Sequence, residues 1–282
     1  MSFGVTFLNG MFYGLNESGV EHPACRMIRA DFGVWKNLID VDQCQRAVDT
    51  LVDILAGDIV MAHLVVRPAM KIAGTIVAGG SASRIGGVDK PLLPIRKAPI
   101  VDFLLQRLSP QVDAISVNVR ATSRQLYANW EKRGVTILFD PFVGRIGPLG
   151  GVIAGLTWLS TLGDDFEWLA TMPGDTPFLP ETLVTKLTGS ARERRDQRPV
   201  VALDGDRVQS LCAIWPKRCL PELLQCVVEG RLRSVRSALN ALGCTEQRID
   251  THHGFFNINT LEDLAEAERL ADQIGCGVEL PI

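Results

Sequence analysis

The sequence predicts an α/β fold, a Rossmann-like three-layer sandwich in which a mostly parallel sheet lies between two layers of helices. From residue 71 onward, short apolar runs of strand character alternate with longer runs whose apolar residues recur at helical spacing. The first of these runs, 72–77, leads directly into a glycine-rich stretch. Such alternation favours parallel strands whose connecting helices cover both faces of the sheet.

The expected elements follow this alternation in chain order. Strands are expected at 72–77, 114–119, 135–139, 168–172, 199–203 and 211–214, and helices at 100–108, 123–133, 149–159, 181–187, 221–228, 234–242 and 261–273. Ligands of such sheets bind beyond the carboxyl ends of the strands. The residues that directly follow each strand are therefore the candidates for function.

The chain is expected to have two parts, an N-terminal extension of unknown role over 1–69 and an α/β domain over 70–282. The extension shows helical spacing over 41–56 but carries no chemical motif. Two hypotheses stay open for it. It is either an accessory segment or a stretch upstream of the natural start of the protein.

Composition narrows the class of protein. The chain of 282 residues has a net charge of -3, and 22% of its residues are charged. It therefore does not have the excess of basic residues that is typical of nucleic-acid-binding proteins. The most apolar run, 51–66, contains two aspartates and a histidine, so no membrane span is expected. The absence of a signal-like start and of any C-x-x-C pair among seven cysteines predicts a cytoplasmic protein with reduced thiols and no zinc site.

The stretch V-A-G-G-S-A-S-R-I-G-G-V-D-K-P-L-L, residues 77–93, predicts a phosphate site. Backbone amides at Gly79 and Gly80 can approach phosphate oxygens closely, while Arg84 and Lys90 can neutralise their charge. The spacing matches neither the Walker loop nor the G-x-G-x-x-G fingerprint. The sequence thus indicates a nucleotide-binding loop of a class other than these two.

Polar residues also follow the next three strands. Asn118 ends the second strand, and Asp140 ends the third, before Gly147, which permits close approach of a ligand. Asp175 ends the fourth strand, where one carboxylate with substrate phosphates would suit Mg²⁺. Each has a structural alternative, a turn for Asn118 and Asp140 and a helix cap for Asp175.

Further along, Gln209, Asn257 and Asn259 are candidates for binding a second substrate. Thr260 and Asp263 form a helix start signal, because a threonine followed three residues later by an acid caps exposed backbone amides.

Taken in order, seven blocks resemble the molybdenum cofactor guanylyltransferases from residue 70 to about 275: G-G-S-A-S-R-I-G-G-V-D-K-P-L-L, V-N-V-R, F-D-P-F, G-P-L-G-G, G-D-T-P-F-L-P, Q-S-L-C-A-I and F-N-I-N-T-L-E-D-L. The first block is shared with a wider superfamily that includes the sugar-nucleotide pyrophosphorylases. The resemblance therefore implies a nucleotide-diphospho-sugar transferase-like fold, and the later blocks narrow it to this family.

The resemblance implies Mg²⁺-dependent transfer of GMP from GTP to the terminal phosphate of molybdopterin, or of its molybdenum-loaded form, with release of pyrophosphate. Arg84, Lys90 and Asp175 are the implied catalytic residues. The implied binding residues are Ala78, Gly79, Gly80 and Lys90 for the GTP phosphates and nucleoside, Asn118 and Asp140 for guanosine, Asp175 for magnesium, and Gln209, Asn257 and Asn259 for the second substrate.

Three alternatives remain at this stage. The enzyme could use CTP on molybdopterin, or it could use GTP on a corrinoid or a sugar phosphate. It could also be a nucleotide-binding regulator without catalysis. Chaperones of molybdoenzymes are further candidate partners, whereas nucleic acid and membrane are not expected.

Overall fold

The computed structural model describes residues 4–8, 11–15, 63–64, 71–79, 84–142, 146–194 and 197–274. The helix expected over 41–56 lies outside the described residues. The chain divides into two compact units, Met1–Pro68 and Ala69–Ile282. In the first unit, β1 (Gly4–Leu8) pairs antiparallel with β2 (Met11–Leu15) and parallel with β3 (His63–Leu64). The roles assigned to the two parts of the chain remain predictions.

A seven-stranded sheet forms the centre of the second unit. Its strand order is β10 (Thr136–Phe139), β9 (Ala114–Val119), β4 (Lys71–Val77), β11 (Phe166–Pro173), β13 (Arg207–Pro216), β12 (Val200–Asp204) and β14 (Thr245–Arg248). Neighbouring strands are parallel except that β13 runs antiparallel to both β11 and β12. The prediction of a mostly parallel α/β sheet is confirmed.

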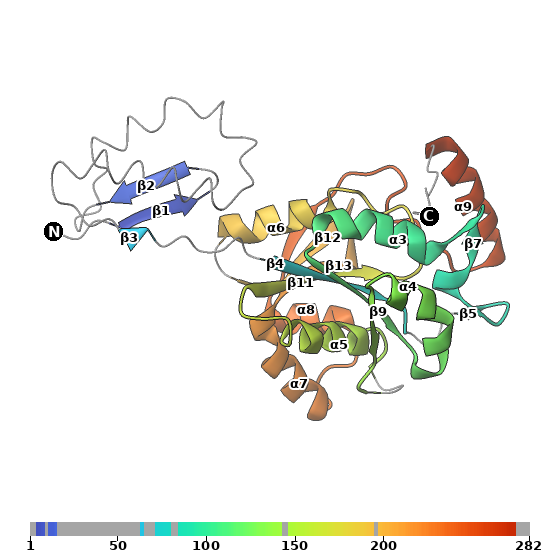
Figure 1. Cartoon of the computed structure of the whole chain (residues 1–282), viewed down its shortest axis with the longest axis horizontal. Helices are drawn as coiled ribbons and strands as arrows, with labels where there is room; N and C mark the ends of the chain where they lie inside the picture. The colour runs from blue at the N-terminus through green and yellow to red at the C-terminus, as the bar shows by residue number, and fades with distance from the viewer. Residues whose placement is uncertain are drawn as a thin grey trace. The chain divides into compact units, whose positions relative to one another are not determined.

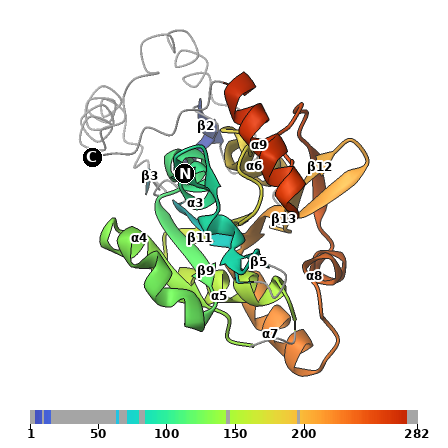
Figure 2. The same cartoon turned by 90° about the vertical axis from the view of Figure 1, so that its right-hand side faces the viewer.

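Helices cover both faces of this sheet, as Figures 1 and 2 show. One face packs against α3 (Ile100–Leu108), α4 (Ala128–Lys132), α6 (Leu183–Arg194) and α9 (Leu261–Ile274), and the other against α5 (Leu149–Leu159), α7 (Leu220–Val228) and α8 (Val235–Leu242). Alternate residues of β13 enter the two cores: Cys212 and Ile214 face one layer, and Ala213 and Trp215 the other. The unit is therefore a three-layer sandwich.

The glycine-rich stretch leads into two short ladders. β5 (Arg84–Ile85) pairs with β6 (Val88–Asp89), and β7 (Pro94–Ile95) pairs with β8 (Ala98–Pro99). The 3₁₀ helix η3 (Lys90–Leu92) joins the two ladders. Within β5–β6, Gly86 and Gly87 have φ of 59° and 85°, a conformation that glycine adopts without strain.

Three predicted elements differ clearly from the structure, and one strand was not predicted. The helix expected over 123–133 is a 3₁₀ helix, η5 (Ala121–Tyr127), followed by the short α4. The helix expected over 181–187 runs from Leu183 to Arg194, because its buried residues continue past Gly189. β13 begins four residues before the expected run, and the sequence analysis missed β14, whose four residues are polar.

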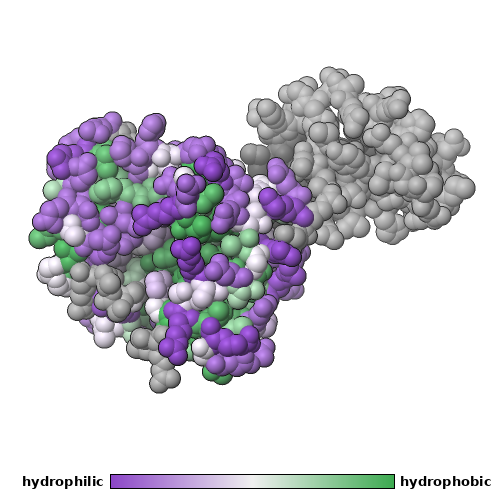
Figure 3. All heavy atoms as spheres, turned by 180° about the vertical axis from the view of Figure 1, so that it is seen from behind, coloured by the Kyte–Doolittle hydropathy of each residue, from purple (hydrophilic) through white to green (hydrophobic). Residues whose placement is uncertain are grey.

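Polar and charged residues cover most of the face in Figure 3, with hydrophobic residues visible between them. Within the part of the chain that the structure describes, no helix has the length and apolar character needed to cross a bilayer.

Candidate functional site

Three neighbouring strands end at one edge of the sheet and bring several predicted site residues together. The order β9-β4-β11 places the carboxyl end of β4 between the other two. The Ala78 amide donates to the Asn118 carbonyl at 2.9 Å, and the Gly174 amide donates to the Val77 carbonyl at 3.0 Å. The end of β4, which leads into the glycine turn, therefore lies beside the loop that carries Asp175.

Asn118 is buried at this edge between two glycines. Its side chain is 1% exposed, and its Nδ2 has no hydrogen-bond partner in the described part of the chain. A β-carbon on Gly79 would lie 2.8 Å from its Oδ1, and one on Gly151 would lie 2.6 Å away. Glycines on both sides let Asn118 fit. A buried donor without a partner costs about 1–3 kcal/mol, so an acceptor on a ligand would relieve this cost.

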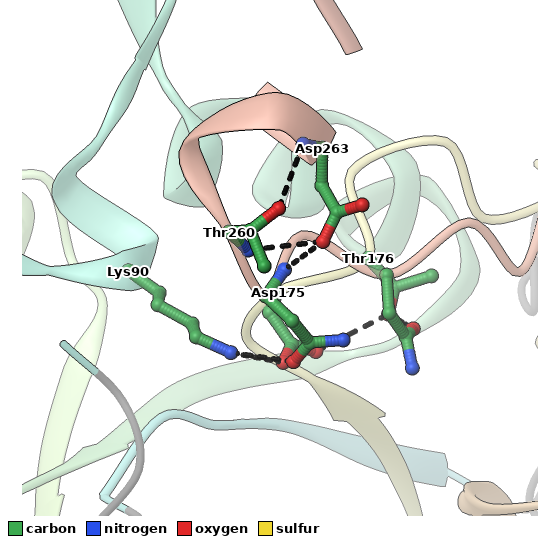
Figure 4. Close-up of polar contacts among 7 residues, drawn as sticks. Lys90, Asp175, Thr176, Thr260 and Asp263 are labelled. Carbon is green, nitrogen blue, oxygen red and sulfur yellow. Dashed lines mark hydrogen bonds and ion pairs between the residues drawn. The ribbon is translucent and has the colours of Figure 1, made fainter. Parts of the chain in front are cut away.

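Lys90 and Asp175 form a second group, shown in Figure 4. The Lys90 side chain is only 8% exposed, and its Nζ lies 3.3 Å from Asp175 Oδ2 and 2.7 Å from Asn259 Oδ1. Asp175 is 26% exposed, which leaves its carboxylate accessible from solvent. The structure thus joins three residues from the first, fifth and last sequence blocks.

The loop before α9 is tied to this group by its backbone. The Ile258 amide donates to the Asp175 carbonyl at 2.9 Å, and the Thr176 hydroxyl donates to Asn257 Oδ1 at 2.5 Å. Thr176 is buried. These contacts hold Asn257 and Asn259 at the same edge of the sheet as Asp175.

The predicted helix start at Thr260 is confirmed. The Asp263 amide donates to Thr260 Oγ1 at 3.1 Å, and Asp263 Oδ2 accepts from the amides of Asn259 and Thr260 at 2.8 and 2.9 Å (Figure 4). These donors, the Asn259 amide first, hold the pKa of Asp263 below its ordinary value. The cap fixes the backbone of Asn259, whose side chain binds Lys90.

Asp140 lies at the N-terminus of α5. Its Oδ1 accepts from the Phe142 amide at 2.7 Å, so the turn predicted as its structural role is present. Its carboxylate also occupies the volume that a β-carbon on Gly150 would need. Gly147 has φ of 55°, with no atom within 4 Å of an added β-carbon, and so takes a left-handed turn beside open space.

Gln209 lies on β13. It pairs with Ala202 on β12, and no hydrogen bond among the described residues links it to Lys90 or Asp175. Between Gln209 and Ala213 the register of β13 shifts against β12, where β13 carries extra residues. Cys212, in this shifted segment, is fully buried, and burial followed by the Asp175 charge raises the pKa of its thiol.

Comparison with known proteins agrees with this arrangement. The family model described as MobA-like NTP transferase domain matches residues 74–243. The chain belongs to this family. A molybdenum cofactor guanylyltransferase from Rhodopseudomonas palustris (strain BisB5) is 36% identical over 200 residues, which are 70% of this chain and 92% of that protein. The resemblance of the sequence blocks is confirmed.

A second related protein supports the family, and a related crystal structure supports the fold. A molybdenum cofactor guanylyltransferase from Mesorhizobium japonicum is 34% identical over 204 residues, or 71% of this chain and 95% of that protein. The crystal structure of molybdopterin-guanine dinucleotide biosynthesis protein A from Archaeoglobus fulgidus superimposes with a TM-score of 0.57 at 19% identity, covering 72% of this chain and 99% of that one. At that identity the likeness shows the fold alone.

Some predicted residues of this MobA-like domain lie outside the described parts. Gly80 and the side chain of Arg84 are among them, although the backbone of Arg84 is described in β5. Sequence reasoning also missed two polar pairs, Thr176 with Asn257 and Asp89 with Arg120. Asp89 directly precedes Lys90, and Thr176 directly follows Asp175. One residue of each pair is therefore a sequence neighbour of a predicted site residue.

The donors around Asp175 fit a magnesium ion better than a zinc ion. No group of three or more His, Cys, Asp or Glu side chains able to hold a metal occurs among the described residues. Asp175 instead offers one partly exposed carboxylate, with the Thr176 hydroxyl 3.4 Å from its Oδ1. Mg²⁺ binds through one or two carboxylates together with substrate phosphates and water.

Proposed function

We propose that the Ala69–Ile282 unit transfers GMP from GTP to the terminal phosphate of molybdopterin, or of its molybdenum-loaded form. As a member of the MobA-like family the chain is a nucleotidyltransferase, and relatives named molybdenum cofactor guanylyltransferase match it at 34–36% identity over 92–95% of their length. The observation that carries the proposal is the unpaired Nδ2 of buried Asn118, at the same sheet edge as the Lys90–Asp175 pair.

The nucleoside would bind at the Asn118 end of this edge. Asn118 Nδ2 supplies a donor, and the glycines on either side, Gly79 and Gly151, leave the room that the Asn118 side chain itself needs at this edge. Asp140 would accept from the guanine edge with the carboxylate oxygen that its own turn does not use. Ala78 and Gly80 would contribute backbone to the same pocket, and Gly147 would border it.

The phosphates would lie toward Lys90. Its ammonium carries three N–H donors, of which two engage Asn259 and Asp175 in the described part of the chain. Lys90 is therefore held in place before substrate binds, as electrostatic stabilisation of a transition state requires. Arg84, on the neighbouring ladder, would add a second cation.

The reaction needs no covalent enzyme intermediate. An oxygen of the acceptor phosphate forms a new bond to the α-phosphorus of GTP, the bond from that phosphorus to the α–β bridging oxygen breaks, and pyrophosphate leaves with the electron pair. The attacking phosphate is already a nucleophile, so the protein mainly aligns the reactants and offsets the charge on the leaving group.

Mg²⁺ would be held by Asp175 and would neutralise the phosphates. Lys90, which binds the other side of that carboxylate, orients Asp175 for this task. The second substrate would bind near Asn257 and Asn259, with Gln209 as a further contributor from β13. Molybdoenzyme chaperones in the cytoplasm are the candidate recipients of the product.

Two measurements test this proposal. Pyrophosphate release with GTP, Mg²⁺ and molybdopterin should be observed, and it should require all three. In a thermal-shift series with GTP, CTP, ATP and UTP in the presence of Mg²⁺, only GTP should raise the melting temperature strongly, since a ligand that binds the native state stabilises it by mass action. A larger shift with CTP would favour a cytidylyltransferase, and GTP binding without turnover would favour a regulator.

A further inference from the structure

An ion pair with a buried carboxylate lies beside the proposed GTP site and is not accounted for by the proposed chemistry. Arg120 donates from a guanidinium N–H to Asp89 Oδ1, and Asp89 is only 5% exposed. Tyr127, itself buried, lies close enough that its pKa is raised by its own burial and then by the Asp89 charge. A charge-assisted pair in such surroundings is held more rigidly than a surface pair.

Each partner of this pair lies next to a residue assigned to the GTP site. Asp89 directly precedes Lys90, and its backbone pairs with that of Arg84 in the β5–β6 ladder. Arg120 directly follows β9, two residues after Asn118. The pair therefore connects the segment with the two cations to the strand with the nucleoside-binding amide.

The backbone of the β5–β6 ladder needs such an anchor. Its two strands are two residues long and are joined through Gly86 and Gly87, which have little conformational preference of their own. An isolated ladder of this size is only marginally stable in water. A buried side-chain contact at Asp89 fixes it from the end that leads into Lys90.

We propose that the Asp89–Arg120 pair is a positioning device that holds Arg84 and Lys90 at a fixed place relative to Asn118. The inference rests on the GTP site proposed above. Without the pair, the phosphate-binding and nucleoside-binding halves of that site would no longer keep their spacing, and GTP would be held out of line for attack.

The chain contains a matched control for this idea. Asp102 on α3 is 6% exposed and accepts from Arg133 Nη1 at 3.2 Å and from Trp130 Nε1 at 2.7 Å. It is thus another buried, arginine-paired aspartate, but its hydrogen-bond partners in the described part of the chain, Trp130 and Arg133, are not residues assigned to the GTP site. Asp102→Asn should reproduce the loss of stability that follows from removing a buried carboxylate, without the loss of positioning.

The experiment compares Asp89→Asn, Arg120→Met and Asp102→Asn by two measurements on the full chain. One is amide hydrogen exchange of residues 84–92 without nucleotide, and the other is kcat/KM for GTP. We expect faster exchange in the first two variants and a fall in kcat/KM of up to about 100-fold, the scale of a displacement of about 1 Å at a reacting centre. Asp102→Asn should show neither change.

Wild-type exchange and wild-type kcat/KM in Asp89→Asn and Arg120→Met would overturn the inference. Equal losses in Asp102→Asn would overturn it too, because the effect would then be general destabilisation. If Asp89→Asn does not fold, Arg120→Lys, which keeps the charge but loses the guanidinium geometry, is judged by the same two outcomes. If the wild-type protein does not turn over GTP, the proposed function fails, and the exchange measurement alone still decides whether the pair anchors the ladder.

Discussion

Replacing Gly151 by alanine tests the packing around Asn118 most directly. Gly151 lies in the first turn of α5, where an added β-carbon would be 2.6 Å from Asn118 Oδ1 and 2.7 Å from Val77 Cγ1. Both neighbours belong to the buried ends of β9 and β4, so neither can move away freely. The substitution should therefore displace the Asn118 side chain that we assign to the nucleoside.

The same chemical change at Gly189 provides the control. Gly189 lies within α6, and a β-carbon there would meet no atom within 4 Å. Alanine should stabilise a helix by about 0.5–1 kcal/mol relative to glycine. This gain is common to both sites, so the difference between the two variants isolates the cost of overpacking at Asn118.

The expected difference follows from that cost. Overpacking a close-packed core destabilises by about 1–3 kcal/mol, and 1 kcal/mol shifts the melting temperature of a unit of this size by about 2–4 °C. Gly151→Ala should thus melt about 2–12 °C below Gly189→Ala. The assay is thermal unfolding of both variants, with and without GTP.

GTP should also stabilise Gly151→Ala less than it stabilises Gly189→Ala, because the displaced amide can no longer reach the ligand. Equal melting temperatures for the two variants would contradict the packing argument. If GTP raised the melting temperature of Gly151→Ala as much as that of Gly189→Ala, Asn118 would not contribute to nucleotide binding, even if the two variants differ in stability without GTP.

Three further predictions concern charged groups at the same edge. Asp175→Asn keeps the shape of the side chain but removes the charge, so turnover should be nearly abolished; retained Mg²⁺-dependent pyrophosphate release would exclude Asp175 as the metal ligand. Lys90→Ala should lower the rate of transfer by about 10²- to 10³-fold, the loss measured for one oxyanion donor, whereas Lys71→Ala, which removes an exposed pair with Asp165, should leave the rate unchanged. Asp263 has a folded-state pKa below its ordinary value of 3.8, so its cap stabilises the fold above that value and loses its effect as the pH falls below it. Asp263→Asn should accordingly melt below wild type at neutral pH, and this difference in melting temperature should disappear as the pH falls well below 3.8.

The sequence predicted the second unit well where local pattern and burial agree. β9 and the helices α3 and α5 have the expected bounds, because their apolar residues recur at the period of one element type and face a core. β14 was not predicted because T-E-Q-R has no apolar pattern. It forms a strand by pairing with β12 at the edge of the sheet, an interaction between distant residues that local pattern does not record.

For the site, the sequence indicated which residues follow each strand, and the rule for parallel sheets indicated that these residues would share an edge. It could not indicate which of them would touch. Lys90 and Asn259 are 169 residues apart, yet their side chains meet at 2.7 Å. The pairing of Asp89 with Arg120 was equally invisible, since each residue has an ordinary surface interpretation when read alone.

Residue type and spacing alone thus determined the fold class and the kinds of groups available for nucleotide chemistry, because periodicity and short motifs are local properties of the chain. The resemblance of the sequence blocks indicated the family. Tertiary structure decided two other matters: that the buried side-chain amide of Asn118 has no partner in the described part of the chain, and that Lys90 binds both Asp175 and Asn259. These depend on strand order and register, which are set by the packing of the whole sheet between its two helical layers.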